Sequence, residues 1–407
     1  MVSNRTHVLL MSYWFPPANV IGALRPYKMV KYLAHNGFEV SVVCCSESGF
    51  DSQDVVDFSS LNVMQIRRPW FLRYLESGGS ALHRIFKFSL KSCFYPDEHI
   101  IVRGKLMKAA NEIFASNNSP DVVVSSAWPF SMHTIARQVA ITHGVPWVAD
   151  NRDLWAENPY RRFRMLTKYF DAKYERHILT SAHACLVIGD VMRESLARSL
   201  SPYKEILVVR NGADSLEVAP GNESRRPADA KLNFTYTGKL YKGYRDCTPL
   251  LNAIRDGGFD ADIDFYGSEI DAIEKYRKAF PDLNVTWHDK QARSRVREIQ
   301  KGADFLFMAL GAGPFEKGIL TGKFYEYLEV GKPIIAICNE DTELAGLIAK
   351  FNLGIATRSV TRLREFIELH IEQGFPGVRL PDTLTREYQL SKFRDCLLKL
   401  QRTAPES

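Results

Sequence analysis

The sequence predicts an α/β protein built from two Rossmann-like domains, and three observations carry this prediction. The chain has 407 residues, more than one hydrophobic core usually organises. Strand-like apolar runs alternate with helical patterns along nearly the whole chain, which is typical of βαβ units and parallel sheets. A polar stretch with a proline at residues 201–205, SPYKE, interrupts this alternation before it resumes. We therefore expect one domain at residues 1–203 and another at 204–383, facing each other across a cleft.

Composition and charge are those of an ordinary globular protein, with 45% hydrophobic and 25% charged residues. No apolar run approaches the roughly 20 residues that span a bilayer. The first 17 residues lack a small-residue cleavage site, so we interpret them as leading into a first strand and expect a cytoplasmic protein. Seven scattered cysteines without CxxC spacing argue against a disulfide framework or a zinc site. The net charge of +6 is too small to predict nucleic-acid binding, but it favours an anionic membrane or a phosphorylated substrate.

The first domain is expected to begin with a strand at residues 6–13, a helix at 24–37 and a strand at 38–45. The loop at 14–26, WFPPANVIGALRP, leaves the carboxyl end of the first strand, where open α/β sheets bind ligands. Gly22 would allow close approach of a substrate, and Arg25 would meet a phosphate or hydroxyl on the acceptor side. The alternative is a structural turn with a surface arginine.

Two segments mix basic residues with aromatic ones, the first at residues 67–95 and the second at residues 161–176. The second segment has six basic residues against two acids. Such mixtures suit a lipid-facing segment, so we expect peripheral contact with an anionic inner-membrane surface, with ordinary helix faces as the alternative. No recognition motif accompanies them, so we expect no nucleic acid. The basic residues of the first segment are Arg67, Arg68, Arg73, Arg84, Lys87 and Lys91.

Polar residues also follow two later strands of this domain, at residues 120–130 and 145–155, which flank a helix at 131–144. Because the carboxyl ends of parallel strands meet at one edge of a sheet, we expect these residues to converge there. Asp153 beside Arg152 can hold a charge and still accept hydrogen bonds. His133 is a catalytic candidate, with a capping or core histidine as the alternative. The polar residues concerned are Ser125, Ser126, His133, Asp150, Arg152 and Asp153.

In the second domain, strand-like runs begin near residues 206, 232, 261, 284, 303, 334 and 353. An amphipathic tail at about 384–401 predicts a last helix that packs back on the first domain. The segment at 318–337, GILTGKFYEYLEVGKPIIAI, predicts a helix over residues 321–330 with Lys323 and Glu326 on one face. Thr321 as N-cap and Gly322 would open this helix to an anion such as phosphate, with Lys323 as countercharge. The alternative is an amphipathic helix with solvated charges.

Five segments resemble, in the expected order, landmarks of the family 4 glycosyltransferases, which are retaining enzymes of the GT-B fold. The resemblance covers nearly the whole chain. The segments are YWFPPANVIGALRPYKMVKYLAHNGFEVSVVC at 13–44, WVADNRDLW at 147–155, RNGAD at 210–214, TGKLYKGYRD at 237–246 and the segment at 318–337.

The resemblance implies that a nucleotide-sugar donor lies against the second domain, its diphosphate held by basic residues and a helix N-terminus without a metal or other cofactor. Glu326 corresponds to the second of the family's paired glutamates and would bind the ribose hydroxyls, while Lys323 would face the diphosphate. The further phosphate-binding candidates are Lys239, Lys242 and Arg245.

One departure from the family pattern concerns the first of the paired glutamates, whose position is Gly318 here. Glu316 and Lys317 flank it, and the preceding loop offers backbone N–H groups at Gly311 and Gly313. Donor contacts are therefore expected from this loop. A subgroup with Lys-Gly at this place acts in bacterial surface-polysaccharide synthesis, which is the role the resemblance implies.

The resemblance thus implies retaining hexosyl transfer from a nucleotide sugar to a hydroxyl of a glycan or lipid-linked acceptor. Lys323 would stabilise the leaving diphosphate, while Asp153 and less directly His133 would contact substrate, with Arg25 and Arg152 on the acceptor side. Two alternatives remain: a catalytically impaired nucleotide-sugar-binding subunit, because of Gly318, and a sugar-nucleotide epimerase of the same architecture.

Overall fold

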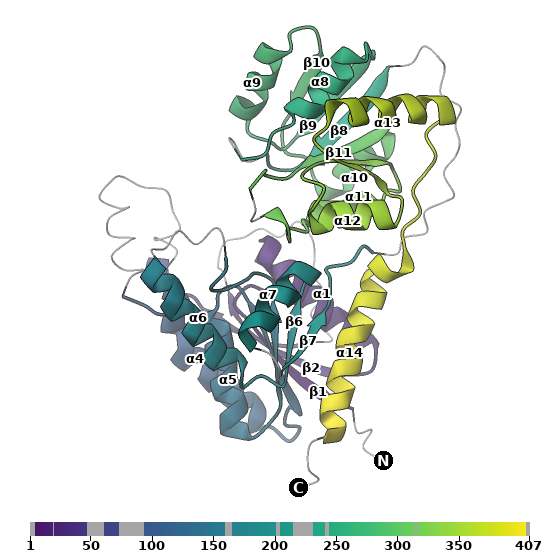
Figure 1. Ribbon diagram of the computed structural model, residues 1–407. Coiled ribbons are helices and arrows are strands. Elements are labelled where there is room, and N and C mark those ends of the chain that lie inside the picture. The colour runs from purple at the N-terminus through teal and green to yellow at the C-terminus, as the bar shows by residue number, and fades with distance from the viewer. Residues whose placement is uncertain are drawn as a thin grey trace. The chain divides into compact units, whose positions relative to one another are not determined.

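The computed structural model describes residues 5–18, 20–46, 61–72, 93–158, 165–200, 204–214, 231–240, 244–313 and 316–403. The chain divides into two compact units, Met1–Val209 with Leu390–Ser407, and Arg210–Gln389. Each unit is built around one sheet of parallel strands with helices on both faces (Figure 1). No helix among the described residues is long and apolar enough to cross a membrane.

The first unit contains a seven-stranded sheet in the order β3-β2-β1-β4-β5-β6-β7. Its central strands are buried on both faces: Val8 and Leu10 pack into one core, and Leu9 and Met11 pack into the other. The strands are β1 His7–Ser12, β2 Glu39–Ser46, β3 Asn62–Arg67, β4 Val122–Ala127, β5 Trp147–Asn151, β6 Ala184–Val187 and β7 Glu205–Val208.

Helices cover both faces of this sheet. Met29 and Leu33 of α1 share a core with Phe393 and Leu397 of α14, the helix drawn in yellow in Figure 1, whereas α4 and α5 pack on the other face. The helices are α1 Ile21–His35, η1 Glu98–Val102, α4 Arg103–Phe114, α5 Ser131–His143, α6 Met165–Leu179, α7 Asp190–Leu200 and α14 Arg386–Thr403.

The second unit contains a six-stranded sheet in the order β10-β9-β8-β11-β12-β13. Helices α8, α9 and α13 cover one face, and α11 and α12 cover the other. The strands are β8 Leu232–Thr237, β9 Ala261–Tyr266, β10 Asn284–His288, β11 Phe305–Ala309, β12 Ile334–Ile337 and β13 Gly354–Ala356. The helices are α8 Thr248–Asp256, α9 Ile270–Ala279, α10 Arg293–Gly302, α11 Gly322–Leu328, α12 Glu343–Lys350, α13 Val360–Gln373 and η3 Asp382–Leu384.

Both sheets share the strand order of a doubly wound fold, in which the chain reverses its winding direction between the first and fourth strands. The predicted fold class of two Rossmann-like domains is therefore confirmed. The reversal falls between β1 and β4 in the first unit and between β8 and β11 in the second. Ligands of such sheets bind at the carboxyl ends of the strands beside this point.

Two local predictions differ from the structure. The strand predicted from residue 206 was expected to open the second domain, but β7 pairs with β6 and completes the first sheet. The first unit therefore extends to Val209, beyond the predicted boundary, because β7 finds its hydrogen-bond partner there. The helix expected over 321–330 spans only Gly322–Leu328.

Candidate functional site

A lysine with a buried nitrogen lies at the carboxyl edge of the second sheet. The Nζ of Lys323, on α11, lies 3.4 Å from the centroid of the Tyr236 ring on β8. Gly238 follows β8 with a φ of 94°, and a Cβ there would lie 3.5 Å from Cε of Lys323. The positive φ explains the glycine, and a Cβ at this distance would be in ordinary contact with the lysine. The lysine is thereby brought to the point where the winding of this sheet reverses.

Two polar side-chain atoms at the start of α11 are buried within the protein. The side chain of Lys323 is partly exposed, but its Nζ is buried and has no hydrogen-bond partner among the described residues. The same holds for Oγ1 of Thr321. Thr321 is the N-cap residue, as predicted, but its side chain accepts no N–H of the helix. Buried polar groups are rarely left unpaired by the protein alone, so both atoms are available to an anionic or hydroxylated ligand.

The electrostatic environment around Lys323 is cationic. Burial lowers the pKa of Lys323 well below its usual range, and the charge of Arg245 lowers it further. Cys247 and Glu326 act in the opposite direction, but more weakly. Two basic side chains therefore share one region of the carboxyl edge, an arrangement that a diphosphate would stabilise.

The other predicted donor-binding residues lie in different settings. Lys239 forms a surface ion pair with Glu269, with 2.9 Å between Nζ and Oε1. Lys242 lies outside the described residues. Glu326 and Gly322 are exposed on α11. Of the three basic candidates after β8, Arg245 is the one that the structure associates with Lys323.

The loop before α11 is held by contacts within the protein. Glu316 is buried, and a Cβ on Gly311 would lie 3.1 Å from its Cγ, so glycine makes room for this side chain. The carbonyl of Gly313 accepts a hydrogen bond from the N–H of Glu316 at 3.1 Å. Lys317 pairs with Asp341 at 2.7 Å on the surface. Gly318 is half-buried and follows directly, without a carboxylate at this position.

In the first unit, Arg25 and Asp150 form a buried ion pair at the carboxyl edge of the seven-stranded sheet. Nε of Arg25 donates to both carboxylate oxygens at 3.0 Å, and a terminal nitrogen donates to Oδ1 at 2.7 Å. Ser126 donates to Oδ2 of Asp150 at 2.9 Å. Arg25 is 7% exposed and Asp150 is fully buried. The guanidinium predicted to face an acceptor therefore holds α1 against β4 and β5.

Arg152 is similarly committed to the protein. Its guanidinium donates to the carbonyl oxygens of Ala127, Trp128 and Gly22. A Cβ on Gly22 would lie 3.3 Å from a terminal nitrogen of Arg152, so Gly22 makes room for this arginine. Arg152, which follows β5, therefore connects the first turn of α1 with the end of β4. Asp153 is exposed beside them and keeps an accessible carboxylate.

His133 is the predicted candidate whose placement argues most clearly against substrate contact. The side chain is fully buried, with Nδ1 2.7 Å from Oγ of Ser125 and Nε2 3.1 Å from Oδ1 of Asn151. Burial lowers its pKa to about 4. The alternative interpretation as a core histidine fits this geometry, so we do not retain His133 as a catalytic candidate.

Sequence reasoning did not single out an aromatic cluster at the same edge of the first sheet. Nε of Arg68 donates to the hydroxyl of Tyr13 at 2.9 Å. The His99 ring packs edge-on against Tyr13 and Trp128, with centroid distances of 4.3 and 5.0 Å. The position of Tyr13 and Trp128 directly after β1 and β4 is the sequence signal that points to them.

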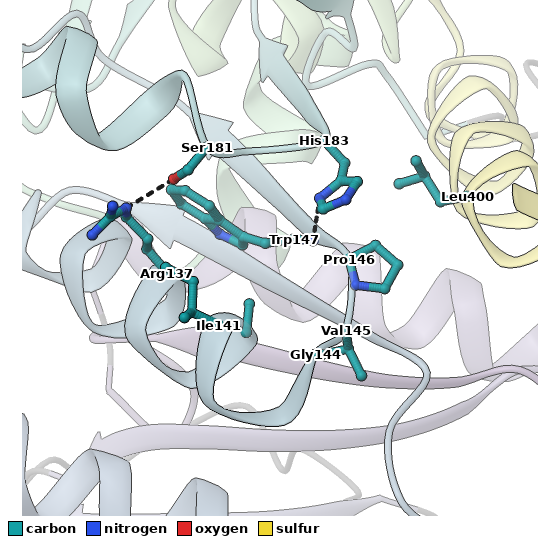
Figure 2. A pocket seen from close by; sticks show the side chains of 10 residues that line it. Arg137, Ile141, Gly144, Val145, Pro146, Trp147, Ser181, His183 and Leu400 are labelled. Carbon is teal, nitrogen blue, oxygen red and sulfur yellow. Dashed lines mark hydrogen bonds between the residues drawn. The ribbon is translucent and has the colours of Figure 1, made fainter. Parts of the chain in front are cut away.

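A cavity of about 310 Å³ lies at the opposite, amino-terminal edge of the first sheet (Figure 2). Its lining includes Trp147 at the start of β5, Arg137 of α5 and Leu400 of α14, and Arg137 donates to Oγ of Ser181 at 2.9 Å. None of the predicted site residues lines this cavity. Within the described ranges, no three His, Cys, Asp or Glu side chains are arranged to hold a metal ion.

Comparisons with known proteins agree with this architecture. Residues 23–212 match the family model described as "Glycosyl transferase 4-like domain". No curated protein matches the chain significantly. Anabaena HepE in complex with UDP is 11% identical, with 98% of each chain covered and a TM-score of 0.61. The lipopolysaccharide outer core galactosyltransferase WaaB is 13% identical, with 97% of this chain and 99% of that chain covered and a TM-score of 0.58.

The same architecture also occurs in a different class of enzyme. The UDP-GlcNAc 2-epimerase from Neisseria meningitidis is 11% identical, with 97% of this chain and 100% of that chain covered and a TM-score of 0.54. At such identities the likeness to these solved structures is one of fold, namely the GT-B fold that the sequence resemblance implied.

Proposed function

We propose that the chain transfers a sugar from a nucleotide-sugar donor to an acceptor hydroxyl, and the match of residues 23–212 to the glycosyl transferase 4-like family model supports this proposal. The observation that carries the proposal is that two buried polar atoms, on Lys323 and Thr321 at the carboxyl edge of the second sheet, have no hydrogen-bond partner among the described residues. Arg245 supplies a second cation at this edge. A nucleoside diphosphate is the ligand class that matches two cations and a hydroxyl donor.

The proposed mechanism is retaining and needs no protein nucleophile. As the glycosidic bond breaks, negative charge accumulates on the leaving diphosphate, and Lys323 with Arg245 stabilises it. The departing phosphate oxygen accepts the proton of the attacking hydroxyl. Glu326, exposed on α11, is proposed to bind the ribose hydroxyls, and Asp153 to position the acceptor. No metal ion takes part in this scheme.

We further propose that the acceptor is a glycan or lipid-linked hydroxyl in bacterial surface-polysaccharide synthesis. The likeness in fold to a lipopolysaccharide galactosyltransferase supports this choice. Contact with an anionic membrane surface is part of the proposal. Tyr169 and Phe170 on α6 are 55% and 59% exposed beside Lys173, within the second segment that mixes basic and aromatic residues. Of the first such segment, residues 73–92, with Arg84, Lys87 and Lys91, lie outside the described residues.

The test begins with a thermal-shift panel of UDP-, GDP- and ADP-sugars, because a bound donor stabilises the folded chain in proportion to its occupancy. Transfer from the selected donor is then measured for Lys323→Ala and Glu326→Ala. Loss of one charge that stabilises the leaving group should lower kcat/KM about 100-fold or more. Lys301→Ala, an exposed lysine of α10 paired with Glu298, is the matched control and should retain activity. Near wild-type kcat/KM in Lys323→Ala would refute the assignment.

The epimerase alternative is favoured by one observation, the likeness in fold to a UDP-GlcNAc 2-epimerase. Mass spectrometry after incubation with the donor and membrane extract separates the two reactions: a new glycoside supports transfer, and an isomer of the donor alone supports epimerisation. A catalytically impaired subunit, suggested by Gly318 in place of a glutamate, would bind the nucleotide but form neither product.

A further inference from the structure

We propose that the diphosphate of a nucleotide enters the site at Lys323 together with a proton, so that Lys323 is neutral in the free protein and charged in the complex. The inference rests on the proposed function, since it takes a nucleoside diphosphate as the ligand. It adds a property of the same site, namely that binding of the anion and protonation of the lysine are one coupled event.

The geometry around Nζ does not stabilise a permanent charge. The nitrogen is buried over the Tyr236 ring, and no described residue accepts a hydrogen bond from it. A cation over an aromatic face gains about 0.5–2 kcal/mol. Removing an ammonium group from water costs several kcal/mol in real proteins. The ring alone therefore does not offset the lost hydration, and the neutral amine is favoured in the free protein.

Among the described residues, the groups that face Lys323 from each neighbouring element supply little countercharge. From the segment after β8, Arg245 adds a like charge, and burial keeps the nearby Cys247 thiol protonated by raising its pKa to about 12. Burial also raises the pKa of the Tyr236 and Tyr327 hydroxyls above the ordinary value, so both stay neutral. The carboxylate that favours the charged lysine is Glu326, which is exposed on α11.

A bound diphosphate favours the charged form of Lys323, because the nucleotide places roughly two to three negative charges next to Nζ and Arg245. The amine then takes one proton from the solvent, and an ammonium–phosphate pair forms with no other bond made or broken. The complex holds one more proton than the free protein and free nucleotide together. Affinity therefore falls with rising pH in the window between the pKa of Lys323 in the free protein and its higher pKa in the complex. One proton taken up corresponds to a tenfold loss of affinity per pH unit in that window.

The coupling is measured by calorimetric titration of the full chain with UDP at pH 8 in buffers of different ionisation enthalpy. The terminal phosphate, with a pKa of about 6, is already ionised at this pH, so it takes up no proton itself. Wild type should take up a substantial fraction of one proton per UDP bound. Lys323→Arg should take up none, since a guanidinium stays charged even when buried. Lys301→Met, on the exposed face of α10, should behave as wild type.

A second measurement does not require the arginine variant to bind UDP. In protein carrying 13C at lysine Cε, the signal absent from Lys323→Arg identifies Lys323, and it should move from the neutral to the charged position when UDP is added. UDP binding without proton uptake, or uptake that persists in Lys323→Arg, would overturn the coupling but leave the donor site standing. Failure of UDP, GDP and ADP to bind wild type would overturn the donor site, and the coupling with it.

Discussion

Breaking the buried ion pair of Arg25 and Asp150 is expected to destabilise the first unit strongly, and Asp150→Asn tests this directly. The substitution keeps the shape of the side chain and a hydrogen-bond acceptor but removes the charge. Arg25, 7% exposed, then keeps a positive charge without its buried partner, and the nearby Arg152 loses the same favourable charge. Breaking a buried pair in this way costs about 3–5 kcal/mol.

In a unit of this size, 1 kcal/mol shifts Tm by about 2–4 °C, so Asp150→Asn should lower the Tm of the first unit by about 10 °C. Urea unfolding followed by the fluorescence of the buried Trp147 and Trp155 gives the free energy. Asp395→Asn, at an exposed aspartate of α14 that also belongs to the first unit, is the control and should change stability by less than about 0.5 kcal/mol.

A loss below about 1 kcal/mol for Asp150→Asn, or a loss equal to that of Asp395→Asn, would refute the reasoning. A paired replacement separates charge from packing. Arg25→Met combined with Asp150→Leu removes both buried charges, so it should recover much of the stability that Asp150→Asn loses. If the double variant is as unstable as Asp150→Asn, the cost lies in packing and not in the unpaired charge.

Two further predictions concern a buried acid and a surface. Burial raises the pKa of Glu175 to about 7 from an ordinary 4.5, so its contribution to stability is present below pH 4.5 and is lost as pH rises through 7. Glu175→Gln should therefore raise Tm at pH 8 by several degrees and leave Tm nearly unchanged at pH 4.5. The control Glu194→Gln, at an exposed position, should leave Tm nearly unchanged at both pH values. A Tm difference between Glu175→Gln and wild type that does not change with pH would contradict this prediction. Sedimentation of the wild-type protein with anionic vesicles should decrease as the salt concentration rises. It should be weaker for the double variant Tyr169→Ser/Phe170→Ser than for the control Tyr388→Ser, at an exposed position of α14. If wild type does not sediment with the vesicles, the membrane proposal is wrong.

Much of the fold followed from local patterns. Runs such as Val122–Val124 are apolar at every position because a central parallel strand is buried on both faces, and that property is visible without coordinates. The segment with Lys323 could be proposed as an anion site because the lysine follows Thr321 and Gly322 directly in the sequence. Local spacing is sufficient for such a proposal where the residues concerned are neighbours in the chain.

The tertiary structure decided which charges are buried and which partners they meet. Arg25 and Asp150 are 125 positions apart, and nothing in their local sequence indicates that they pair. His133 and Arg152 were predicted to face substrate, yet both are committed to partners within the protein. Even for Lys323, the sequence by itself determined a cation near a helix start, whereas the burial of its nitrogen over Tyr236 came from the packing of α11 against β8. Desolvation depends on all the atoms around a group, so only the folded chain shows where a charge is costly.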